Sequence, residues 1–214
     1  MVRGLIRGVG AGLVTVALTG CSSQVAVDQP LAEESAKGVA KGDGKGDAAR
    51  TAAKGGTVGG AGSPCALPVS FDLAADWKPK PVKEDKQFGP TKQGPVTLLC
   101  EIDAKPAGHI GFLRVWTGGR SGDDARKALE AFVADGAKSR DKVVYAPAEA
   151  GQYAATEVTY LNTNEFLDEP KKERAIAFTT PKGVVVVHLG GLDSEEHDAM
   201  LPAYELAKKS VHGA

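Results

Sequence analysis

The sequence lacks the short motifs of several common catalytic sites. It contains no G-x-S-x-G nucleophile elbow, no phosphate-binding loop ending in G-K-[ST] and no H-E-x-x-H metal pair. An excess of charge of one sign is also missing, because 26 basic and 27 acidic residues leave a formal net charge of −1. A basic surface for nucleic acid is therefore not indicated. We expect a protein that is not an enzyme and that has no catalytic residues, no metal, no cofactor and no nucleic-acid partner.

Aromatic residues are absent from positions 1–64, which end in a long segment rich in Gly, Ala, Lys and Asp. A segment of this composition cannot bury enough apolar surface to offset the entropy of ordering its backbone. Residues 21–64 are therefore predicted to form a disordered linker. Its lysines could instead contact anionic lipid or wall polymer, although neighbouring acidic residues dilute their charge.

Residues 1–20 have the order of a secretory signal peptide. Two arginines precede an uncharged apolar run over 9–18, and Gly20 stands directly before Cys21. The run is shorter than the roughly 20 apolar residues of a spanning helix, which makes an uncleaved membrane anchor the weaker alternative. A plain cleaved signal peptide is the other alternative.

The stretch Leu18-Thr19-Gly20-Cys21 resembles the lipobox of bacterial lipoproteins. This resemblance implies that the chain is cut before Cys21 and that this cysteine is acylated, with a fatty acid such as palmitate. The partner at this end is then membrane lipid, and the protein is held on the extracytoplasmic side of the cell membrane.

The three cysteines support export independently. With Cys21 assigned to lipid, Cys65 and Cys100 remain, and an even remainder in an exported domain most simply forms a disulfide. A metal pair or a redox pair is the alternative. A metal site would need more ligands nearby, and redox pairs usually have two-residue spacing.

All aromatic residues lie beyond Cys65, and residues 65–214 have the length of one domain with one core. Alternating apolar residues predict strands, and apolar residues at helical spacing predict two helices. The predicted strands cover about 69–73, 95–103, 109–117, 152–161, 172–179 and 183–189, and the predicted helices are capped near Ser121 and at Asp193. The pattern is that of an α+β domain with a mostly antiparallel sheet flanked by helices.

Three local signals refine this prediction. Thr180-Pro181-Lys182-Gly183 has Pro and Gly where a tight turn requires them. The next segment, 184–189, is apolar on both faces and indicates a central strand covered on both sides. Pro202 should kink the last helix or divide it into two segments.

The order of these elements, with Phe71 and an early Trp77 after a polar turn, resembles the small actinobacterial lipoproteins that carry a PsbP-like α/β/α sandwich. The resemblance covers about residues 65–211. It implies a non-enzymatic adaptor, and we expect a monomer. No functional residue can be carried over, because the likeness lies in element order and not in a catalytic signature.

The histidines are widely spaced. His188 falls on the predicted central strand and is expected to be a hydrogen-bonded core residue, whereas His197 is expected to be solvated in the first turn of the last helix. Folding could bring either one near Asp193, Glu195 or Asp198 to hold a metal, although their spacing does not favour it.

Two loops carry alternative functional interpretations. Glu165, Asp168 and Glu169 lie in an acidic loop that either guards an edge strand against aggregation or forms a docking surface. The glycine-rich turn at 118–122 could cradle an anion before a helix, but the acids that follow it favour a plain strand-to-helix turn. Trp77 and Trp116 are expected to be core residues.

The sequence thus predicts a cell-envelope lipoprotein that acts as a non-catalytic binding or assembly module for an unidentified envelope protein or ligand. The alternative is a carrier or enzyme whose small-ligand pocket forms only in three dimensions. A deep apolar pocket would favour the alternative, and a shallow apolar patch would favour a partner surface.

Overall fold

The computed structural model describes residues 51–83, 91–163 and 169–214. These residues belong to one compact unit, Lys45–Ala214. The predicted signal peptide, Cys21 and most of the predicted linker lie outside the described residues, as do Glu165 and Asp168.

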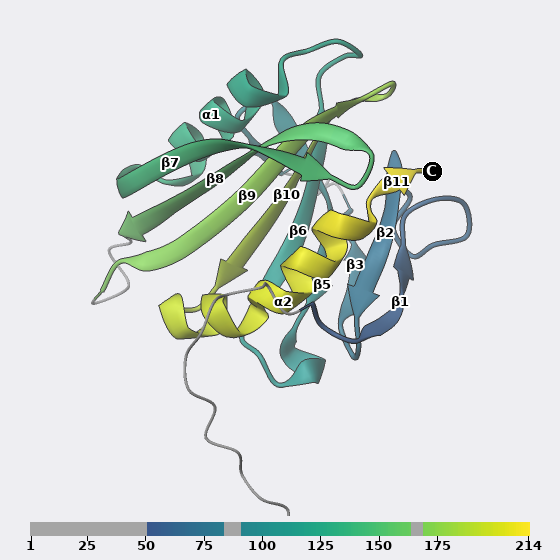
Figure 1. The fold of residues 1–214 in the computed structure, drawn as a ribbon, viewed down its shortest axis with the longest axis horizontal. Coiled ribbons are helices and arrows are strands. Elements are labelled where there is room, and N and C mark those ends of the chain that lie inside the picture. Colours follow the sequence, from purple (N-terminus) through teal and green to yellow (C-terminus); the bar gives the residue numbers. More distant parts are fainter. Residues whose placement is uncertain (1–50, 84–90, 164–168) are drawn as a thin grey trace, which may run out of the picture. The chain divides into compact units, whose positions relative to one another are not determined.

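The described part of the chain is rich in strands and has two α-helices (Figure 1). The strands are β1 (Lys54–Val58), β2 (Val69–Ala74), β3 (Lys78–Pro81), β4 (Lys92–Gln93), β5 (Val96–Asp103), β6 (Gly111–Gly118), β7 (Ser139–Ala150), β8 (Tyr153–Thr163), β9 (Lys171–Thr180), β10 (Gly183–Gly191) and β11 (His212–Gly213). The helices are α1 (Ala125–Gly136) and α2 (Ser194–Ser210), and a short 3-10 helix spans Lys105–Ala107.

Antiparallel pairing builds two sheets. The larger sheet has eight strands, in the order β3-β5-β6-β10-β9-β8-β7, with β4 also paired to β5. The smaller sheet has the order β1-β2-β11. Strand β10 lies at the centre of the larger sheet and all of its residues are buried, which confirms the predicted central strand. The predicted tight turn at residues 180–183 is also confirmed, because it joins β9 to β10 in an antiparallel hairpin.

Alternate residues of β10 enter two separate cores on opposite faces of the sheet. Val185, Val187 and Leu189 pack in a core with α2 and the smaller sheet. Val184 and Val186 pack on the other face with α1, whose Phe132 is central to that core. Figure 1 shows α2 crossing the larger sheet beside β2. The layered α+β architecture predicted from the sequence is therefore confirmed.

Four sequence predictions need correction. The domain does not begin at Cys65, because β1 forms within the predicted linker, where pairing with β2 buries Val58 completely. Strand β7 was not predicted, since most of its side chains are exposed and its periodicity is weak. Asp124, rather than Ser121, caps α1 by accepting two backbone hydrogen bonds. Helix α2 is continuous through Pro202, which excludes two segments, one of the two predicted alternatives.

The core predictions for the tryptophans and the cysteines are confirmed. Trp77 and Trp116 are buried. Cys65 and Cys100 form a disulfide with Cα atoms 5.9 Å apart, which ties the loop before β2 to β5. Within the described ranges, neither helix has the length and apolar character needed to cross a membrane.

Candidate functional site

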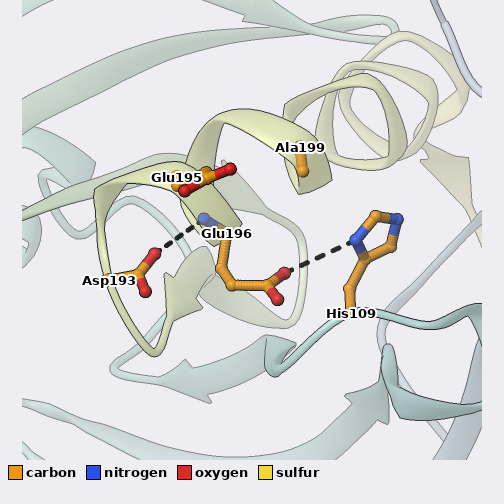
Figure 2. Close-up of a pocket in the computed structure, with 5 residues that line it drawn as sticks. All are labelled: His109, Asp193, Glu195, Glu196 and Ala199. Atoms are coloured by element: carbon orange, nitrogen blue, oxygen red, sulfur yellow. Dashed lines mark hydrogen bonds and ion pairs between the residues drawn. The ribbon is translucent and has the colours of Figure 1, made fainter.

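A small hollow lies where β10 passes into α2, beside the loop that leads into β6 (Figure 2). Its volume is about 290 Å³, and it is lined by His109, Asp193, Glu195, Glu196 and Ala199. The two loops are held together by a backbone hydrogen bond of 2.9 Å from Leu192 N to Ile110 O. This bond brings His109 to the acidic first turn of α2.

The start of α2 explains part of this acidity. Asp193 caps the helix, because its carboxylate accepts a hydrogen bond of 2.8 Å from Glu196 N, as the predicted capping arrangement requires. Acidic side chains in a first helical turn are also favoured by the helix dipole. Glu195 does not take part in the helix cap, and its side chain is exposed at the hollow.

Glu196 points from the helix toward His109 in Figure 2, and its Oε2 atom lies 3.4 Å from His109 Nδ1. This oxygen is buried and accepts no hydrogen bond from the described residues. The Glu196 side chain as a whole is 23% exposed, so its carboxylate contributes negative charge to the hollow.

Two exposed apolar residues are chain neighbours of residues that line the hollow. Ile110 is 56% exposed and Leu192 is 48% exposed, and they follow and precede the lining residues His109 and Asp193. We call these two side chains, together with the residues that line the hollow, the Ile110–Leu192 surface. The sequence predicted a strand over about 109–117 that would include Ile110. The strand begins instead at Gly111, which leaves Ile110 outside the sheet.

A second group of ionisable residues lies on the opposite side of β10 from α2. Glu173 is 4% exposed and contacts two side chains: His188 Nε2 lies 2.8 Å from Oε2, and Lys171 Nζ lies 3.0 Å from Oε1. Burial alone would raise the pKa of Glu173, but His188 and Lys171 outweigh it and lower the pKa to about 2. His188 is thus the hydrogen-bonded core histidine that was predicted.

A third group joins α2 to the sheet. Tyr204 donates a hydrogen bond of 2.7 Å to Glu157 Oε1, and Lys208 donates to the same oxygen at 3.2 Å and to Glu205 at 2.8 Å. Complete burial, followed by the Glu157 charge and hydrogen bond, holds the pKa of Tyr204 well above its usual value. These contacts lie between packed elements, so we assign them to holding α2 in place.

His197 differs from its prediction. It was expected to be solvated, but it is only 3% exposed, and its Nδ1 atom has no hydrogen-bond partner among the described residues. Burial lowers its pKa to about 4, although the charge of Glu173 acts in the opposite direction. Across the described ranges, no three His, Cys, Asp or Glu side chains come together as a metal site, so the considered metal site near Asp193 is not formed there.

The remaining predicted sites are placed as follows. Glu169 is exposed, while its predicted partners Glu165 and Asp168 lie outside the described residues. The glycine-rich turn before α1 is occupied by the chain itself, because Asp123 Oδ2 accepts a hydrogen bond of 2.7 Å from Arg120 N. The plain turn was therefore the correct interpretation of that segment.

Comparison with known families identifies the chain as a lipoprotein. The sequence model of a family described as uncharacterised lipoprotein matches residues 35–211. This match covers most of the chain, and the chain belongs to that family. A search of curated proteins finds no match.

Proposed function

We propose that this member of the lipoprotein family is anchored on the outer face of the cell membrane and acts there as a non-catalytic binding or assembly module. The anchor in this proposal is acylated Cys21, released from a signal peptide over residues 1–20. The family match supports a lipoprotein and thereby membrane association. The cleavage site, the acyl group and the PsbP-like, adaptor-type character rest on the sequence resemblances.

The location of the perturbed ionisable groups carries the binding part of the proposal. Strongly shifted pKa values occur at Glu173, His197, Tyr160 and Tyr204, all of which are buried in the packed interior. A catalytic site usually places such groups in a cleft that substrate can reach. None of these four lines the hollow. The ionisable groups with shifted pKa values therefore lie in the packed interior and not at the hollow.

The shape of the surface supports the same role. The hollow has a volume of about 290 Å³, at the small end of ligand sites, and four of its five lining residues are ionisable. Ligand pockets that bury a small molecule are lined mainly by apolar side chains. A small acidic hollow beside exposed apolar residues is better suited to a protein surface.

The anchor is tested by replacing Cys21→Ala, with Ser22→Ala as the neighbouring control. Cys21→Ala should abolish incorporation of radiolabelled palmitate and cleavage of the precursor, so that the chain keeps residues 1–20, while Ser22→Ala should behave as the native protein. Membrane attachment, palmitate labelling and a mass that are all unchanged in Cys21→Ala would contradict the anchor.

The binding role is tested by chemical crosslinking in intact cells. A binding module should give a discrete adduct larger than the 22.1 kDa chain, at a yield that His188→Gln leaves unchanged once protein abundance is equalised. Charge reversal at Glu165, Asp168 and Glu169 tests in the same experiment whether the acidic loop contributes to the contact. The binding role would be wrong, and an enzyme would take its place, if no adduct forms and if the protein has an enzymatic activity that disappears in His188→Gln.

A further inference from the structure

The clustering of exposed apolar side chains is the starting observation. Three large apolar residues are strongly exposed in the described part of the chain: Ile110, Leu192 and Val144. Val144 stands apart on the edge strand β7, whereas Ile110 and Leu192 are joined by a backbone hydrogen bond. Single exposed apolar residues are ordinary, but a pair beside a hollow is typical of a contact surface.

The charge beside this pair decides between its candidate occupants. An anionic lipid surface would face the carboxylates of Asp193, Glu195 and Glu196, which disfavours insertion of the pair into the membrane. A second copy bound about a two-fold axis would set the same carboxylates against each other. A partner with a positive charge next to an apolar side chain complements both parts of the surface.

We propose that the Ile110–Leu192 surface docks a segment of a partner protein in which a Lys or Arg lies beside an apolar residue. The apolar side chain covers Ile110 and Leu192, and the cation enters the hollow between Glu195 and Glu196. This inference rests on the proposed binding function and names the chemistry of its partner.

The hollow offers the cation a defined acceptor. The Glu196 side chain lines the hollow and is 23% exposed, so an ammonium or guanidinium group in the hollow can donate a hydrogen bond to its carboxylate. Its neighbour His109 Nδ1, at 3.4 Å, is the basic group among the five lining residues. Glu195, exposed at the rim, adds a second negative charge without being needed for the helix cap.

The test places a photo-crosslinking amino acid, benzoylphenylalanine, at position 110 or at position 192 of the full chain in living cells. Position 144 is the matched control, because Val144 is 58% exposed and Ile110 is 56% exposed. After irradiation, mass spectrometry identifies the crosslinked segment. We expect positions 110 and 192, but not 144, to capture one protein segment that carries Lys or Arg next to an apolar residue.

The charge requirement is tested in the position-110 protein by Glu195→Lys. Glu149→Lys is the control, since Glu149 is also exposed but lies on β7. Glu195→Lys should lower the yield of the adduct about fivefold or more, whereas Glu149→Lys should leave it unchanged.

Each other outcome overturns the inference. A lipid adduct, an adduct to a second copy of the chain, a segment without basic residues, or equal capture at positions 110 and 144 would each contradict it. The same amino acid is also placed at position 169, in the acidic loop, and capture there but not at position 110 would refute this surface and leave the binding function standing. Absence of any protein adduct at all four positions would count against both.

Discussion

Acidification should destabilise the protein through His197, because this side chain is buried in its neutral form. His197 is 3% exposed in the first turn of α2, and its Nδ1 atom has no hydrogen-bond partner among the described residues. Burial lowers its pKa from 6.5 to about 4. The nearby charges of Glu173 and Asp198 act to raise this pKa, and Arg174 and His188 act to lower it further.

The size of the effect follows from the two pKa values. The folded value lies below the unfolded one, so the unfolded chain binds more protons between them. The contribution of His197 to stability is therefore complete above its unfolded pKa of 6.5 and is lost as the pH falls toward about 4. Between pH 7 and pH 5 the loss is about 2 kcal/mol.

Urea denaturation of the purified protein at pH 7 and pH 5 measures this loss. His197→Leu should lose about 2 kcal/mol less than the native protein between these conditions, because leucine binds no proton. His212→Gln is the control, since His212 is exposed, and it should retain the native pH dependence. Equal losses in the native protein and in His197→Leu would refute a buried neutral His197.

Two further predictions concern stability. Replacing both Cys65 and Cys100 by Ala opens a loop with a sequence separation of 35. It should lower the free energy of unfolding by roughly 4 kcal/mol and Tm by about 8–16 °C, and a calorimetric shift below about 2 °C would contradict this. Glu173→Gln removes the carboxylate shared by His188 and Lys171 and should cost about 3 kcal/mol at neutral pH. The folded pKa of Glu173 is lowered to about 2, so the contribution of its carboxylate to stability is complete above the ordinary pKa of 4.5 and is lost as the pH falls toward 2. The difference in the free energy of unfolding between native protein and variant, measured by urea denaturation, should therefore shrink over that range. A difference that stays constant there would exclude the shared carboxylate as its cause.

The sequence predicted best the elements whose own residues determine them. Strand β10 is apolar on both faces, so its central place could be predicted without knowing its neighbours. The cap at Asp193 depends on contacts within one helical turn, and it formed as expected. The disulfide could be predicted because exported domains rarely leave a pair of thiols free.

Features that depend on distant neighbours were missed. The burial of His197 requires α2 to lie against the sheet, which the sequence pattern of the helix alone does not reveal. Strand β1 exists because β2 pairs with a glycine-rich segment whose composition favours a linker. The Ile110–Leu192 surface was missed because its two loops are far apart in the sequence and meet only through the order of β6 and β10 in the sheet.

The most direct test of a lipid-anchored binding module is native mass spectrometry of the protein extracted from membranes in mild detergent. The account predicts a chain that begins at an acylated Cys21 and leaves the membrane in a complex with a second protein, which dissociates at higher collision energy. An unmodified chain that still carries residues 1–20, or an acylated chain that is never found with another protein, would contradict it.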